Sequence, residues 1–128
     1  MILMRPLISV VDDDDSVRES LPDLLRELGF AVQAFASAEA FLASNYVDQT
    51  KCLVLDVAMP GMSGPELQRQ LLARQHNVPI VFMTAYGDLR VHMLQQGAIE
   101  CLLKPFSDTA LRDAVDAALR VGEMHVQP

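Results

Sequence analysis

Four short apolar stretches of this chain each end in a polar side chain whose chemistry complements that of the others. The stretches cover residues 7–11, 52–55, 80–83 and 99–103. The side chains that follow them are Asp12 with Asp13, Asp56, Thr84 and Lys104. Carboxylates, a hydroxyl and an ammonium group are the parts of a site that transfers a phosphoryl group, provided that they meet in space.

The apolar stretches are typical of strands in a parallel sheet. Helix-length segments separate them along the chain, and a further strand is expected over residues 30–36. Crossover helices cover both faces of a parallel sheet, so its strands are apolar throughout rather than alternating. The carboxyl ends of such strands share one edge, which is where ligands bind. We therefore expect the four polar endings to gather in one crevice.

The segments between the strands carry signals of helix starts and ends. The first has apolar residues at helical spacing up to Gly29, which suits the position after a helix C-terminus, and Pro22 within it predicts a kink or a delayed start. Ser37, Ser63 and Ser107 are placed to cap later helices. Five alternating β and α units predict an α/β fold, a doubly wound three-layer sandwich.

Composition narrows the class of protein. The 128 residues suffice for one domain, and 51% of them are hydrophobic. A formal net charge of −7 argues against nucleic-acid binding by this domain. No apolar stretch approaches the roughly 18 residues of a membrane span, and the apolar start is a poor signal peptide. We expect a cytoplasmic domain that binds no membrane, with Cys52 and Cys101 as buried thiols.

Convergent carboxylates require positive charge among them. Two like charges about 4 Å apart repel by roughly 4 kcal/mol at an effective dielectric constant near 20. Lys104 supplies one positive charge, and a divalent cation would supply the rest. Oxygen ligands without a nearby His or Cys favour Mg²⁺, which commonly binds through one or two carboxylates, water and a phosphate.

Asp56 is the candidate nucleophile because it stands alone after what should be the central strand. Lys104 would balance the charge of the incoming phosphoryl oxygens, and the Thr84 hydroxyl would donate a hydrogen bond to one of them. Asp14 and Asp15 are interpreted as solvated residues at a helix N-terminus. The three histidines share no metal-ligand spacing.

In order and spacing these motifs resemble the receiver domain of two-component response regulators over residues 5 to 121. The resemblance rests on Asp12-Asp13, on Asp56 with residues 59–64, on Thr84-Ala85 and on Lys104-Pro105-Phe106. It implies a flavodoxin-like (CheY-like) five-stranded parallel sheet with strand order 2-1-3-4-5. Residues 1–122 would form the receiver domain, and residues 123–128 a tail or a truncated linker.

The resemblance also implies roles for individual residues. Asp56 would accept a phosphoryl group from a sensor histidine kinase. Asp13 and Asp56 would ligate Mg²⁺ directly, together with the main-chain carbonyl of Ala58, while Asp12 would act through water. Such a signalling domain catalyses its own phosphorylation and slow dephosphorylation and is not a typical enzyme.

Thr84 and Lys104 match the groups that read phosphorylation in this family, and the Lys104-Pro105 bond is expected to be cis. The family switches a surface made by its fourth helix, fifth strand and fifth helix, which would form a homodimer or control transcription through an effector domain. Two departures fall on this surface. Cys101 stands where the family usually has Tyr or Phe, and the spacing of 20 positions from Thr84 to Lys104 (104 − 84) is short. We expect normal phosphorylation with altered readout.

Two other classes of protein share part of this pattern. A phosphatase or mutase of the haloacid dehalogenase type also forms an aspartyl phosphate, but it needs a second Asp two residues after the nucleophile, where this chain has Ala58. A receiver-like interaction module that works without phosphorylation is the main alternative. Only Cys101 and the short fourth helix favour it.

Overall fold

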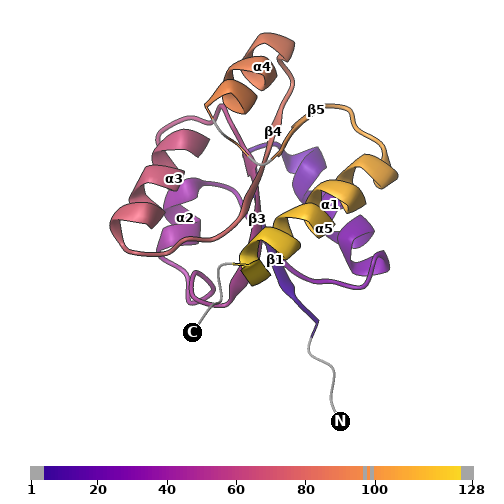
Figure 1. The fold of residues 1–128 in the computed structure, drawn as a ribbon, viewed down its shortest axis with the longest axis horizontal. Helices are drawn as coiled ribbons and strands as arrows, with labels where there is room; N and C mark the ends of the chain where they lie inside the picture. The colour runs from indigo at the N-terminus through magenta and orange to yellow at the C-terminus, as the bar shows by residue number, and fades with distance from the viewer. Residues whose placement is uncertain (1–4, 97, 99, 125–128) are drawn as a thin grey trace.

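A computed structural model of the chain describes residues 5–96, 98 and 100–124. Strands and helices alternate along it (Figure 1). The strands are β1 (Leu7–Val11), β2 (Ala31–Phe35), β3 (Thr50–Asp56), β4 (Ile80–Thr84) and β5 (Glu100–Leu103). The helices are α1 (Asp15–Glu27), α2 (Ala38–Leu42), α3 (Gly64–Ala73), α4 (Gly87–Gln95) and α5 (Asp108–Met124). None of the helices among the described residues is long and apolar enough to cross a membrane.

The five strands form one parallel sheet with the order β2-β1-β3-β4-β5. This is the flavodoxin-like arrangement that the family resemblance predicted. The sheet separates two sets of helices: Figure 1 shows α1 and α5 on one side, α2 and α3 on the other, and α4 at the top of the view. β3 lies in the centre of the sheet, so its last residue, Asp56, has a strand end on each side.

Two core clusters pack against the two faces of the sheet. The first cluster joins the strands to α1 and α5, through side chains such as Leu25 and Leu111. The second cluster joins the strands to α2, α3 and α4, through Phe41, Leu67 and Met93. Because both faces are covered, the strands are apolar on both sides, which explains the uninterrupted apolar stretches of the sequence.

Predicted caps start several helices. The Ser37 side chain accepts a hydrogen bond from the Ala40 amide, and the Ser63 side chain accepts one from the Glu66 amide. Ser107 does the same at the start of α5. Gly29 has a φ of +103°, a conformation that costs glycine little and explains why α1 ends before it.

Some boundaries differ from the predictions. α1 starts at Asp15 and continues through Pro22, so the delayed start is wrong. α5 extends through Met124, so residues 123 and 124 of the predicted tail belong to the helix. Residue 99, predicted to open the fifth strand, and residues 125–128 of the predicted tail lie outside the described residues.

β3 starts two residues earlier than the apolar run, at Thr50. Thr50 is buried, and its hydroxyl lies 2.6 Å from the Ser9 hydroxyl on the neighbouring strand β1. This hydrogen bond lets a polar residue occupy a buried strand position. The two cysteines are buried and free, as predicted.

Candidate functional site

The polar strand endings meet in one cavity of about 280 Å³. It is lined by residues from the ends of β1, β3, β4 and β5 and from the loops that follow β1, β3 and β4. These residues are Asp12, Asp13, Asp14, Asp56, Ala58, Thr84, Ala85, Tyr86 and Lys104. Every residue that the sequence singled out for phosphoryl transfer or metal binding therefore lies in the same place, while the roles assigned to them remain predictions.

Lys104 connects two of the carboxylates. Its Nζ lies 2.7 Å from Oδ2 of Asp12 and 3.6 Å from Oδ1 of Asp56. Asp12 is fully buried, and its other carboxylate oxygen accepts a hydrogen bond of 2.9 Å from the Asp14 amide. The ammonium group thus lies between the ends of β1 and β3, where two carboxylates are buried away from water.

Burial and the neighbouring carboxylates raise the pKa of Asp56, and Lys104 opposes them. Loss of solvent, followed by the nearby charge of Asp12, raises the pKa of Asp56 from its ordinary 3.8 to about 6, although Lys104 lowers it. Burial also tends to lower the pKa of Lys104, but its hydrogen bond with Asp12 and the charges of Asp56 and Asp12 outweigh burial and raise it. Lys104 therefore stays charged, and the site still has an excess of negative charge.

The donor set suits a hard divalent cation. Asp12, Asp13 and Asp56 each place a carboxylate oxygen within 4.8 Å of the others. Asp12 and Asp56 are buried, whereas Asp13 is exposed, so one side of the cluster remains open to water. Oxygen-only ligands, a net negative charge and access for water fit Mg²⁺, which retains several water ligands in proteins.

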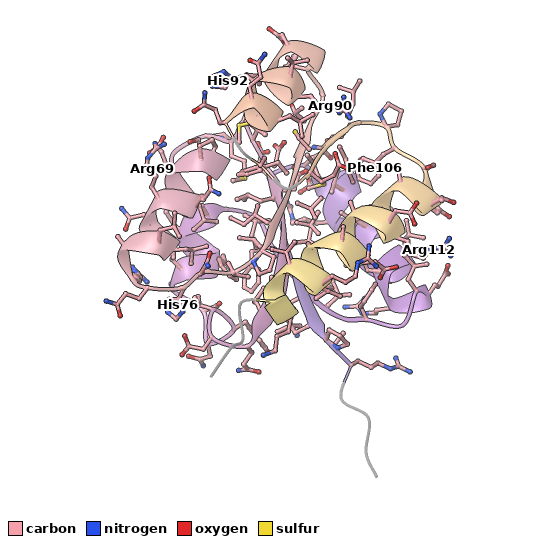
Figure 2. The ribbon with its side chains drawn as sticks, in the orientation of Figure 1. Arg69, His76, Arg90, His92, Phe106 and Arg112 are labelled. Atoms are coloured by element: carbon pink, nitrogen blue, oxygen red, sulfur yellow. The ribbon has the colours of Figure 1, made fainter. Side chains whose placement is uncertain are left out.

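Neither of the two histidines that the structure describes, His76 and His92, belongs to this cluster. Figure 2 shows His92 on α4 and His76 beyond α3, far from each other. The Nε2 atom of His76 instead lies 3.2 Å from Oδ1 of Asp48. His125 lies outside the described residues.

Thr84 is buried at the end of β4, with its side chain at the cavity. Its Oγ1 accepts a hydrogen bond of 3.1 Å from the Tyr86 amide, at the start of α4. A hydroxyl that accepts in this way can still donate its own proton to another oxygen. The Lys104 amide donates to the Thr84 carbonyl at 2.8 Å, which ties the ends of β4 and β5 together. The Lys104-Pro105 bond is cis, as the family resemblance predicted.

The loop after Asp56 is held against the site by close backbone packing. A Cβ atom on Gly64 would lie 2.5 Å from the Asp56 carbonyl oxygen, so α3 begins almost in contact with the end of β3. Gly61 has a φ of +74°, and a Cβ atom there would lie 2.7 Å from a carboxylate oxygen of Glu39. The same oxygen accepts a hydrogen bond of 3.3 Å from the Met62 amide. Gly64 therefore leaves no room for a side chain against the backbone, and the positive φ of Gly61 favours glycine there. The loop that carries Ala58 is fixed from two sides.

Three supporting contacts were missed by the sequence analysis. Arg18 donates to the Asp12 carbonyl, Glu39 accepts from the loop after Asp56, and Arg90 Nε donates to the Cys101 carbonyl at 2.7 Å. Each joins residues from different elements through a main-chain atom. No residue pattern shows which carbonyl or amide a long side chain will reach, so these contacts had no sequence signal.

The sheet order and the acidic cavity with its lysine define a class of protein, the flavodoxin-like regulatory domains of CheY type. A family model described as "Response regulator receiver domain" matches residues 8–116. The chain belongs to the response regulator receiver domain family, whose members are signalling domains.

Relatives and solved structures agree with this assignment. The chain is 45% identical over 116 residues to Nodulation protein W of Bradyrhizobium diazoefficiens, covering 89% of this chain and 51% of that protein. It is 46% identical over 114 residues to the transcriptional regulatory protein FixJ of Azorhizobium caulinodans, covering 88% and 54%. The chain thus spans about half the length of these relatives.

Among solved structures, the response regulator StyR superposes with a TM-score of 0.83 at 50% identity, covering 94% of this chain and 62% of that one. The FixJ-N structure superposes with a TM-score of 0.81 at 35% identity, covering 98% and 99%.

Proposed function

We propose that this domain accepts a phosphoryl group on Asp56 from the phosphohistidine of a sensor histidine kinase, in a reaction that requires Mg²⁺. A carboxylate oxygen of Asp56 forms a bond to phosphorus, the bond from phosphorus to the histidine nitrogen breaks, and that nitrogen regains a proton. The observation that carries the proposal is the cluster of three carboxylates within 4.8 Å, with the Lys104 ammonium 3.6 Å from Asp56.

The other residues have separate roles in this proposal. Asp13, Asp56 and the main-chain carbonyl of Ala58 would hold Mg²⁺, with Asp12 acting through water. When bound, the ion supplies positive charge that offsets the carboxylates and the phosphoryl oxygens. Lys104 stabilises the negative charge on the transferred group as a point charge. The same groups would support transfer from small phosphodonors and slow hydrolysis of the aspartyl phosphate.

Thr84 would report the phosphorylation to the surface. Its hydroxyl would donate to a phosphoryl oxygen, and the resulting movement would disturb its bond to the Tyr86 amide at the start of α4. Three exposed apolar side chains lie on or beside α4 and β5: Tyr86, Val91 and Leu103. They support a docking role for the α4-β5-α5 surface, as a homodimer contact or as a contact with an effector domain that controls transcription.

Two features of this chain favour a modified readout. Cys101 is fully buried on β5, at the place where family members usually carry an aromatic residue. α4 spans only Gly87–Gln95, and Met93 is the buried residue within it. A smaller side chain and a short, lightly anchored helix would change the balance between the unphosphorylated and phosphorylated forms without altering the acceptor cavity.

The test is incubation with acetyl phosphate and Mg²⁺ followed by intact mass measurement. We expect one phosphate adduct on the wild-type chain, none with a chelator present, and none on the Asp56→Asn variant. Asp23→Asn on α1, which changes an exposed aspartate, is the matched control and should be modified like the wild type. An adduct on Asp56→Asn would contradict the assignment of the acceptor. A folded wild-type protein without any adduct would favour a module that works without phosphorylation.

A further inference from the structure

Arg18 links the first turn of α1 to the turn that carries two of the candidate metal ligands. Its Nη1 donates a hydrogen bond of 2.9 Å to the main-chain carbonyl of Asp12, and its Nη2 pairs with the carboxylate of Asp15. The Arg18 side chain is 24% exposed, whereas that of Asp15 is 83% exposed. The guanidinium group therefore lies over the backbone turn rather than extending into solvent.

The contact completes a set of bonds that fixes Asp12. The Asp12 amide donates to the Phe35 carbonyl on β2, one carboxylate oxygen accepts from the Asp14 amide, and the other contacts Lys104. Arg18 provides the donor for the remaining main-chain group, the carbonyl. A planar guanidinium that contacts a carbonyl and a carboxylate together holds its position better than a single ammonium can.

We propose that Arg18 is a positioning residue for the metal site: its guanidinium holds the β1-α1 turn so that Asp12 and Asp13 present their carboxylates to Mg²⁺. This proposal rests on the proposed function, because it assumes that these carboxylates bind the ion. Arg18 itself does not line the cavity and is not expected to touch the ion or the phosphoryl group.

A positioning role and a simple charge effect predict opposite results. If Arg18 acted only through its positive charge, removing it would strengthen the binding of a cation at this site. If Arg18 acts by holding the turn, its loss weakens binding even when a positive charge is kept. Arg18→Lys keeps the charge but loses the planar group, and Arg18→Gln removes the charge.

The chain offers a matched control at the other end of α1. The Nη1 atom of Arg26 lies 3.3 Å from Oδ1 of Asp23. Its Nη2 donates a hydrogen bond of 3.4 Å to the Val32 carbonyl on β2. It therefore makes the same two kinds of contact as Arg18, but away from the cavity. Arg26→Gln should leave the Mg²⁺ affinity unchanged.

The experiment is a Mg²⁺ titration of the full chain, followed by the backbone amide chemical shifts of Asp13 and Asp14. We expect Arg18→Lys and Arg18→Gln each to weaken Mg²⁺ binding about tenfold, as is common when a group that orients a metal ligand is removed. Tighter binding by Arg18→Gln, or wild-type affinity in Arg18→Lys, would overturn the positioning role. A wild-type chain that takes up no Mg²⁺ would overturn the proposed function instead.

A second measurement does not depend on the metal. The Asp14 amide donates to the Asp12 carboxylate, so its hydrogen exchange reports the order of the turn. In metal-free protein, exchange at this amide should be faster in both Arg18 variants than in the wild type or Arg26→Gln. If Arg18→Gln does not fold, Arg18→Lys carries both measurements, and unchanged exchange in Arg18→Lys would count against the proposal.

Discussion

Replacing Asp56 with Asn should stabilise the metal-free domain at neutral pH. Burial and the charge of Asp12 raise the pKa of Asp56 from 3.8 to about 6, so the ionised carboxylate is less favourable in the folded chain than in the unfolded one. A shift of about two pKa units corresponds to roughly 3 kcal/mol of lost folding free energy. The uncharged Asn avoids this loss, and we expect a gain of about 1 to 3 kcal/mol.

The stabilisation of the folded chain by Asp56→Asn should decrease as the pH falls. Between about pH 4 and pH 6 the folded wild type holds a proton on Asp56 that the unfolded chain has released, so wild-type stability rises as the pH falls through this range. Above about pH 6 Asp56 is ionised in both the folded and the unfolded chain, so the full loss of folding free energy is present. The difference between Asp56→Asn and the wild type should therefore fall to about half at pH 5 and vanish below about pH 4.

The assay is urea unfolding in a chelator at pH 7 and pH 5, followed by circular dichroism because the chain has no tryptophan. Asp23→Asn serves as the control, since this exposed carboxylate should change stability little. Mg²⁺ should then stabilise the wild type more than Asp56→Asn. An Asp56→Asn variant less stable than the wild type at pH 7 would refute the view that the ionised Asp56 carboxylate destabilises the folded chain. A stability difference between the two that is the same at pH 5 as at pH 7 would refute it as well.

Two further predictions concern the elements around the site. Gly64→Ala should lower the free energy of unfolding by about 1 to 3 kcal/mol, because the new Cβ would meet the Asp56 carbonyl at 2.5 Å. Urea unfolding checks this against Gly87→Ala, whose Cβ would meet no atom within 4 Å and which should cost nothing. Arg90→Met should speed amide hydrogen exchange in α4 about tenfold, because it removes the bond to the Cys101 carbonyl, while global stability changes little. Exchange in α4 as slow as in the wild type would show that this bond does not anchor the helix.

The fold was predictable because the strands and their order follow from simple constraints. The apolar stretches before Asp12, Asp56 and Thr84 are buried on both faces of the sheet, and burial of that kind leaves a clear pattern in sequence. Once parallel strands were inferred, the meeting of their polar ends followed from topology. The cis bond before Pro105 came from the family resemblance rather than from any pattern.

The remaining details depend on tertiary contacts. Thr50 extends β3 because the Ser9 hydroxyl lies within hydrogen-bonding distance on the next strand. α1 continues through Pro22, which is buried, and the buried Leu21 and Leu25 flank it in the helix. Local propensity predicted a kink or a delayed start at Pro22, and the helix instead begins at Asp15, because packing against the sheet overrides the local preference for a later start. The contact of Arg18 with a carbonyl likewise became visible only in three dimensions.

The division of the core between the two faces of the sheet limits how a signal can travel. α4 packs into the second cluster and α5 into the first, so the two helices have different neighbours on opposite sides of the sheet. What they share is the short edge strand β5 and its neighbour β4. A displacement of α4 would therefore reach α5 chiefly by tilting β5, which has a paired strand on one side only. Movement of this edge strand would then couple the two helices. The stiffness of the four residues of β5 would set how strongly α4 and α5 move together.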